Sequence, residues 1–110
     1  MPDSHAMDTL TRLEATIAAR LQADPAQSYV ASLGARGLPV IAKKLGEEAT
    51  ETVIAALSGS REELTGEAAD LLFHLLVLLG AKGVPLAEVA AELDRREGTS
   101  GLEEKANRSR

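Results

Sequence analysis

The sequence predicts an all-α domain, and three features of the chain support this. Apolar residues recur at spacings of three and four, which is the period of an amphipathic helix. No segment alternates β-branched and polar residues as strands do. Glycine, proline and serine separate the helical segments at short intervals, as in bundles with short loops. Since 110 residues suffice for one domain, we expect a bundle of four to five helices.

The first two predicted helices lie in the N-terminal third. Asp8 is placed to cap a helix that extends to about residue 23 and ends at Asp24-Pro25. Four apolar residues share one face of it: Leu10, Leu13, Ile17 and Leu21. A short helix over residues 26–37 follows and ends near two glycines, Gly34 and Gly37. Residues 1–7 are assigned to an N-terminal extension or a cloning remnant, residues 8–97 to the domain, and residues 98–110 to a C-terminal tail.

The later helices have clear boundary signals. A long helix begins at Leu38-Pro39, because proline is tolerated in a first turn, and ends at Leu57. After the break at residues 58–60, Ser60 and Glu63 have the spacing of a capping box and open a helix over residues 61–81. Gly83 ends that helix, and a last one extends from Pro85 to Gly98. The tail is predicted to be loop with one helical turn.

Composition limits the function classes. Hydrophobic residues make up 45 % of the chain but aromatic residues only 2 %, so the predicted interior is thin and dimerisation is expected to complete the core. The net charge of −5 argues against a nucleic-acid partner. The absence of cysteine excludes disulfides and Cys-ligated metals. No signal peptide is visible, and the longest apolar run, residues 71–79, is shorter than the roughly 20 residues of a membrane span. We therefore expect a cytoplasmic protein with no membrane partner.

The acidic residues are concentrated in one part of the chain. Between residues 47 and 70 the only basic residue is Arg61, against seven acids: Glu47, Glu48, Glu51, Glu62, Glu63, Glu67 and Asp70. At about 100° per residue, Glu47, Glu48 and Glu51 share a helix face with Lys44, and Glu67, Asp70 and His74 fall within about 60° on the next helix.

The loop at residues 58–60 is short, so the two long helices should pack antiparallel. Glu51 and Glu67 then both lie about 10 Å from the loop, and the two acidic groups meet at one height. Converging carboxylates repel one another unless a cation neutralises them. All-oxygen ligands favour Mg²⁺, with Mn²⁺ as the alternative ion.

A solvated acidic face is the competing interpretation of the first group, with Lys43 and Lys44 pairing the acids at helical spacing. Four apolar residues would cover its other side: Ile41, Leu45, Val53 and Leu57. The second group fits this interpretation poorly, because Asp70 and His74 stand in a segment that is apolar all round and should be buried. His74 is expected to support Asp70 by a hydrogen bond; the alternatives are a direct metal ligand and an ordinary core histidine.

The chain resembles the MazG-like all-α nucleotide pyrophosphohydrolases, and among them the phosphoribosyl-ATP pyrophosphohydrolases of histidine biosynthesis. Four segments carry the resemblance: SYVASLGARG from Ser28, KKLGEEATETVIAA from Lys43, GEAADLLFHLLVLL from Gly66, and RREGTSGLEEKANR from Arg95. Gly34 stands where a larger apolar residue is expected, and Phe73 where tyrosine is common.

The resemblance implies Mg²⁺-dependent hydrolysis of phosphoribosyl-ATP to phosphoribosyl-AMP and pyrophosphate by a homodimer, the second step of histidine biosynthesis. It implies four metal ligands: Glu48, Glu51, Glu67 and Asp70. Glu47 would hold a second metal ion or orient the attacking water. The implied phosphate contacts are Lys43 and Lys44, together with Arg95, Arg96 or Lys105 in the last segment. Tyr29 and Ser28 either line the substrate pocket or serve ordinary packing.

Three other functions remain open at this point. A housecleaning hydrolase of nucleoside triphosphates in the MazG-like group would use the same acids. A di-iron carboxylate bundle would want E-x-x-H on its helices, whereas this chain has E-x-x-D. A non-enzymatic helical dimerisation module would need no clustered acids.

Overall fold

The structure is a computed structural model that describes residues 2–97 and 101–108. Its described part contains no strand and six helices: α1 (Pro2–Leu21), α2 (Tyr29–Arg36), α3 (Leu38–Ser58), α4 (Arg61–Lys82), α5 (Leu86–Arg96) and α6 (Gly101–Arg108). The predicted all-α fold is confirmed. Helices α1 to α5 correspond to the predicted helical segments, and α6 lies in the tail.

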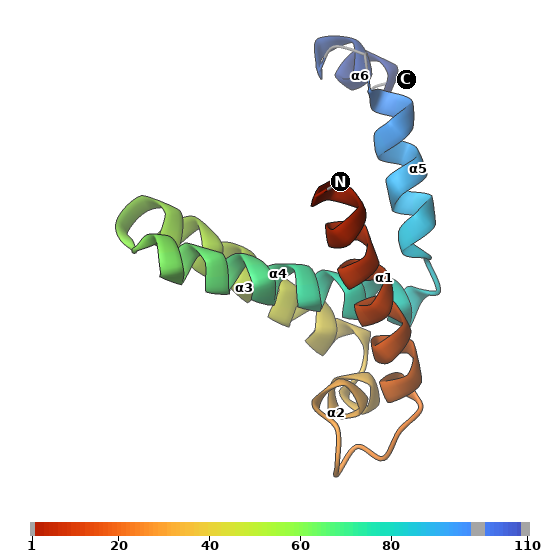
Figure 1. Ribbon diagram of the computed structural model, residues 1–110. Coiled ribbons are helices and arrows are strands. Elements are labelled where there is room, and N and C mark those ends of the chain that lie inside the picture. The colour runs from red at the N-terminus through yellow and green to blue at the C-terminus, as the bar shows by residue number, and fades with distance from the viewer. Residues whose placement is uncertain (1, 98–100, 109–110) are drawn as a thin grey trace.

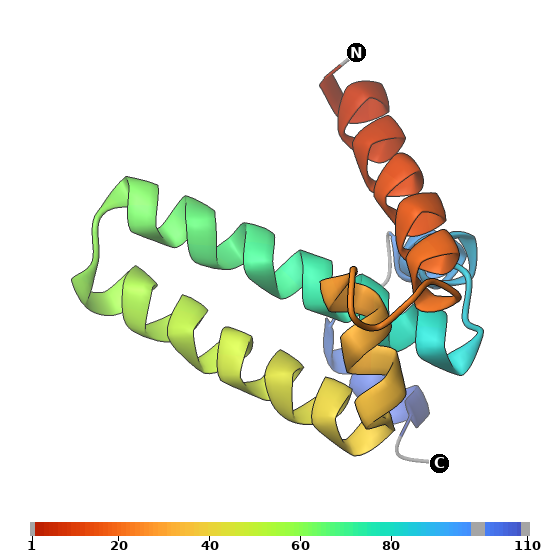
Figure 2. The ribbon, with the colours of Figure 1, turned by 90° about the horizontal axis from the view of Figure 1, so that it is seen from below.

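Helices α3 and α4 form a long antiparallel hairpin, and the other helices lie at the end of it that is remote from the loop between α3 and α4 (Figures 1 and 2). Helix α1 crosses α4, and α2 connects α1 to the start of α3. Helices α5 and α6 continue from the end of α4 that is remote from the hairpin loop (Figure 1). The loop end of the hairpin therefore extends beyond α1 and α2 without another helix of the described chain over it.

The hairpin forms where its boundary residues predict it. Pro39 stands in the first turn of α3, and the capping box at the start of α4 is complete. Glu63 N donates to Ser60 Oγ at 3.1 Å, and Ser60 N donates to the Glu63 carboxylate at 2.8 Å. Gly83 ends α4 in the left-handed conformation, with φ of 71°. These local contacts fix the length and ends of both long helices.

Two predicted helix starts and the predicted tail differ from the structure. Helix α1 begins at Pro2 and not at Asp8, because residues 2–7 contain no glycine and their only proline is in the first turn, where its missing N–H costs nothing. Helix α2 begins at Tyr29, since Asp24 accepts a hydrogen bond from Ala26 N at 3.0 Å and holds the preceding residues in a turn. The tail forms a helix of eight residues where a single turn was expected.

The core lies where α1 to α4 meet. Six buried apolar residues form it: Ile17, Val30, Leu33, Ile41, Leu76 and Val77. Leu21 packs beside this cluster, close to two glycines. A Cβ at Gly34 would lie 3.1 Å from Leu21 Cδ2, and one at Gly80 would lie 3.3 Å from Leu21 Cδ1. Gly34 thus occupies a position expected to be larger because α1 approaches α2 closely there.

Four apolar residues were predicted on the side of α3 opposite the acids, and two of them, Val53 and Leu57, do not face the core of the single chain. Ile41 is buried, but the Val53 side chain is 57 % exposed and Leu57 is 82 % exposed. Both lie in the part of the hairpin that no other described helix covers. Helical periodicity predicts which residues share an apolar side of a helix, but it does not predict what that side packs against.

Helix α4 is, within the described residues, the one helix long and apolar enough to cross a membrane on length and composition. It nevertheless packs against both α3 and α1, and it carries Glu67, Asp70 and His74 within its length. These features are those of the central helix of a bundle.

Candidate functional site

Three carboxylates from the hairpin converge. Oxygen atoms of Glu48 on α3 and of Glu67 and Asp70 on α4 lie within 4.8 Å of one another. The capping box and the short loop set this register, since they bring the two acidic segments of the sequence to the same height on antiparallel helices. Glu48 is buried, Glu67 is half-buried and Asp70 is exposed, so the cluster opens to solvent on one side. Asp70 was expected to be buried and is not.

Glu48 is the unusual member of this cluster. Its side chain is only 8 % exposed, and its Oε2 atom is buried without a hydrogen-bond partner. Burial raises the pKa of Glu48 above its usual range, the neighbouring Glu51 carboxyl raises it further, and His74 opposes the shift. A buried carboxylate oxygen with no partner is costly unless a cation or proton joins it. The group therefore suits an oxygen-seeking metal ion.

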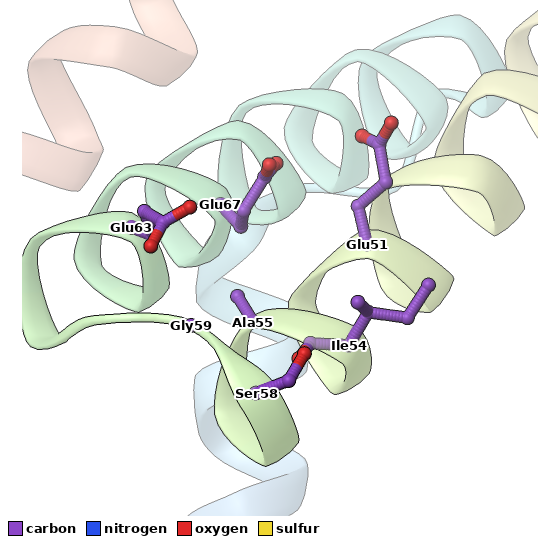
Figure 3. A pocket seen from close by; sticks show the side chains of 7 residues that line it. All are labelled: Glu51, Ile54, Ala55, Ser58, Gly59, Glu63 and Glu67. Carbon is purple, nitrogen blue, oxygen red and sulfur yellow. The ribbon is translucent and has the colours of Figure 1, made fainter.

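Glu51, the fourth predicted ligand, lies beside the cluster. Figure 3 shows its carboxylate on α3 and that of Glu67 on α4 on the same side of the hairpin, with Glu63 one turn nearer the loop. These three acids line a cavity of about 180 Å³. Burial raises the pKa of Glu67, and the charges of Glu51, Asp70 and Glu63 raise it further. The charge of Glu51 thus raises the pKa of both Glu48 and Glu67.

Thr52 connects the two helices directly behind the carboxylates. Its hydroxyl lies 2.8 Å from the carbonyl oxygen of Glu48 and 3.1 Å from that of Glu67. The first is a contact within α3, and the second crosses to α4. Sequence reasoning missed this residue, because a threonine inside a helix carries no signal that its hydroxyl reaches a neighbouring helix.

His74 is a satisfied core histidine that supports the site through the backbone. It is 6 % exposed, its Nδ1 lies 2.7 Å from the Asp70 carbonyl oxygen, and its Nε2 lies 2.9 Å from the Tyr29 hydroxyl. Because a carbonyl only accepts, Nδ1 donates to it, and Nε2 is left to pair with the Tyr29 hydroxyl. Phe73 stacks against Tyr29 at a centroid distance of 6.3 Å. The expected hydrogen bond to Asp70 exists, and it goes to the main chain.

A cavity of about 320 Å³ with a basic lining lies between α2 and the first half of α3. We call it the basic pocket; its lining residues are Tyr29, Leu33, Arg36, Val40, Lys43, Lys44 and Glu47. Lys44 Nζ lies 3.5 Å from Glu47 Oε1, and the charges of Tyr29 and Glu47 raise the pKa of Lys44. Four predicted site residues therefore share one cavity: Tyr29, Lys43, Lys44 and Glu47.

Arg36 also lines the basic pocket, and sequence reasoning did not select it. It is the last residue of α2, where a basic side chain is ordinary because it complements the helix dipole. Its position next to Gly37 and the turn into α3 was the available signal, since that turn brings the end of α2 back toward Lys43 and Lys44.

The predicted basic residues of the last segment lie elsewhere in the chain. Arg95 is on α5 and Lys105 on α6, the helices that leave the far end of α4 (Figure 1). Arg95 and Arg96 both bind the Glu92 carboxylate, at 2.7 and 3.0 Å, and lower its pKa to about 2. The single chain does not bring these basic groups to Glu48.

Comparisons with known proteins agree on one family. A family model described as phosphoribosyl-ATP pyrophosphohydrolase matches residues 10–97. A phosphoribosyl-ATP pyrophosphatase of Erythrobacter litoralis is 74 % identical over 93 % of this chain and 98 % of its own. A protein of the same name from Rhizorhabdus wittichii is 71 % identical over 91 % of this chain and 94 % of its own. Another, from Dinoroseobacter shibae, is 60 % identical over 93 % of this chain and 100 % of its own.

Proposed function

Because the chain belongs to the phosphoribosyl-ATP pyrophosphohydrolase family, we propose that its carboxylate cluster is the metal site at which phosphoribosyl-ATP is hydrolysed to phosphoribosyl-AMP and pyrophosphate. The enzyme class and the substrate follow from the family and from relatives of that name over nearly the whole chain. The reaction belongs to histidine biosynthesis, and we assign the protein to the cytoplasm.

The observation that carries the metal assignment is the convergence of Glu48, Glu67 and Asp70 around a buried carboxylate oxygen with no partner. The donor set is all oxygen, which suits Mg²⁺ or Mn²⁺ better than softer metals. Glu51 is the fourth ligand in this proposal, supported by its electrostatic effect on both Glu48 and Glu67.

The chain's own residues supply positioning and charge in the proposed mechanism. Bound Mg²⁺ would neutralise phosphate oxygens and lower the pKa of a coordinated water. Glu47, which precedes Glu48 on α3 and lines the basic pocket, orients the water that attacks phosphorus at the bridge between the first and second phosphates; the bridging P–O bond breaks and pyrophosphate and phosphoribosyl-AMP are released. Lys43 and Lys44 bind phosphate oxygens, and Tyr29 forms a wall of the substrate pocket. Arg95 and Lys105 are proposed to contact phosphate only if a second chain supplies them.

A pyrophosphate-release assay tests this function. We expect release from phosphoribosyl-ATP in the presence of Mg²⁺ and none after the metal is removed with a chelator. The same assay with a panel of deoxynucleoside triphosphates is the comparison. Faster turnover of those triphosphates would contradict the substrate assignment, and undiminished activity in chelator would contradict the metal assignment.

We also propose that the working form is a homodimer. Three adjacent side chains of α3 support this, since Val53, Ile54 and Leu57 are each more than half exposed in the single chain. Apolar surface of this kind on a small domain marks an interaction site.

A further inference from the structure

The basic pocket carries more positive charge than the carboxylates around it balance. Lys44 has Glu47 as its ion partner, but the side chains of Arg36 and Lys43 have no hydrogen-bond or ion-pair partner in the part of the chain that the structure describes. Leu33, Val40 and the ring of Tyr29 form the apolar part of the lining. Three cations and one carboxylate line the cavity, and this excess of positive charge suits an anion.

The position of the pocket says which anion it suits. Lys44 lines the pocket and stands one helical turn before Glu48 on α3, so the pocket lies about one turn along this helix from the proposed metal site. Arg36 comes from α2, whereas Lys43, Lys44 and the metal ligand Glu48 come from α3. A substrate whose reacting phosphate lies at the carboxylates would therefore place a neighbouring group, not the reacting one, against Arg36.

We propose that Arg36, with Lys43, binds an outer phosphate of the substrate, meaning a phosphate other than the one esterified to the adenosine ribose. The inference rests on the proposed function, because it takes phosphoribosyl-ATP as the ligand. A guanidinium offers a fork of donors that fits phosphate oxygens in pairs, and a lysine adds a point charge. Arg36 is thus a substrate-binding residue for this reaction.

Two parts of phosphoribosyl-ATP carry outer phosphates, and two ligands separate them. ATP has the terminal phosphates of the chain but no phosphoribosyl group. Phosphoribosyl-AMP has the phosphoribosyl phosphate but lacks the terminal phosphates. Calorimetric titration of each ligand, with Mg²⁺ present, measures binding without requiring turnover.

The variant is Arg36→Met, which keeps the length of the side chain and removes its charge. Arg36→Lys restores a cation. Arg20→Met is the matched control, since Arg20 stands in the last turn of α1 as Arg36 does in α2 and does not line the basic pocket. Thermal melting of all three variants checks that each one folds.

We expect Arg36→Met to weaken the binding of one of the two ligands about 10- to 100-fold, as loss of a charged hydrogen bond does. Arg36→Lys should recover part of it, and Arg20→Met should bind as the parent does. If only phosphoribosyl-AMP binding is weakened, the phosphoribosyl phosphate is the group held in the pocket. If only ATP binding is weakened, the terminal phosphates are held there.

Two results would overturn the proposal. One is unchanged binding of both ligands. The other is an equal loss for both, because the phosphate they share is the one beside the bond that breaks. Neither result depends on the proposed reaction, whose failure would appear separately as absence of pyrophosphate release by the unmodified protein.

Discussion

At the scale of single residues, Tyr29 has two faces with different partners. Its hydroxyl is occupied by His74 Nε2 at 2.9 Å, while its ring forms part of the basic pocket and is exposed on that side. The sequence offered ring packing and pocket lining as alternatives for this residue. The geometry combines them, because the buried end of the side chain packs and the outer part faces the cavity.

Tyr29→Phe separates these two contributions. Removal of the hydroxyl leaves a buried His74 nitrogen without a partner, which costs about 1–3 kcal/mol. We expect the melting temperature to fall by several degrees while KM for phosphoribosyl-ATP changes less than threefold, since the ring remains. A large increase in KM with unchanged melting temperature would mean that the hydroxyl serves the substrate instead.

When no metal is bound, ionised Glu48 destabilises the folded chain, whereas the Tyr29 hydroxyl stabilises it. The pKa of Glu48 is raised, so the ionised form is disfavoured in the folded state and the carboxylate destabilises the apo-protein at neutral pH, above its unfolded pKa. Glu48→Gln should therefore raise the melting temperature of the apo-protein and abolish the further rise that Mg²⁺ produces.

The same variant should lower kcat about a hundredfold or more, because a charged ligand is lost. Glu62→Gln is the matched control, since Glu62 is an exposed acid of the same segment outside the cluster. A Glu48→Gln protein that still gains stability from Mg²⁺ would argue against Glu48 as a ligand.

At the scale of the elements, the hairpin owes its register to the loop between α3 and α4. The Ser60–Glu63 capping box starts α4 at a fixed residue, and Thr52 then ties the helices together at the level of Glu48 and Glu67. The hydrogen bonds from Ser60 lower the pKa of Glu63. The capping contacts and the carboxylate cluster thus belong to one local unit.

Ser60→Ala should lower the free energy of unfolding by about 1 kcal/mol at pH 7, as loss of a helix cap does. Because the pKa of Glu63 is lowered on folding, the stabilisation is complete above its unfolded pKa and is lost as the pH falls through the folded value. The difference between the parent and the variant should therefore shrink below about pH 4. Denaturant unfolding at several pH values measures this.

Ser58→Ala is the control for that experiment. Ser58 lies at the other side of the same loop, and its hydroxyl donates to the Ile54 carbonyl within the last turn of α3. It should change stability little and without the same pH dependence. Because the Ser60 N–H keeps its bond to the Glu63 carboxylate in Ser60→Ala, Glu63→Gln completes the test, and a pH-independent effect of Glu63→Gln would contradict the role of Glu63 in the cap.

The sequence predicted the hairpin well because its signals are local. Pro39, the Ser60–Glu63 pair and Gly83 each act within one turn of the chain, so their effects can be read from spacing. The convergence of Glu48, Glu67 and Asp70 followed from the same spacing and one short loop.

What the sequence could not supply was contact between distant segments. Arg36 enters the basic pocket because the turn at Gly37 folds α2 back on α3, and Thr52 reaches Glu67 across a helix interface. The start of α1 was missed for another reason. Asp8 is a good cap in isolation, but a cap is used only where the preceding residues leave the helix.

At the scale of the whole molecule, the single chain is more extended than a compact domain. Its radius of gyration is 15.9 Å, against about 13 Å expected for this length. The hairpin projects on one side, and α5 on another contributes no buried residue. A second copy packed on the hairpin would cover the exposed apolar residues of α3 and supply the missing compactness.

Leu57→Glu tests this dimer. Since the Leu57 side chain is 82 % exposed in the single chain, the substitution should not disturb the fold of one chain, and its effect should fall on self-association. Sedimentation is expected to show a dimer for the parent and for Leu57→Met, and a monomer for Leu57→Glu. A Leu57→Glu protein that remains dimeric would place the interface elsewhere.

The hairpin also has a consequence for how quickly the site is assembled during folding. The predicted metal ligands and Thr52 all lie between residues 48 and 70, and closing one short loop brings them together. Contacts of such small sequence separation form early and fast, because little chain entropy is lost before they are made. We therefore expect the ligand geometry to form early in folding, when the hairpin closes, and before α1 packs against α4.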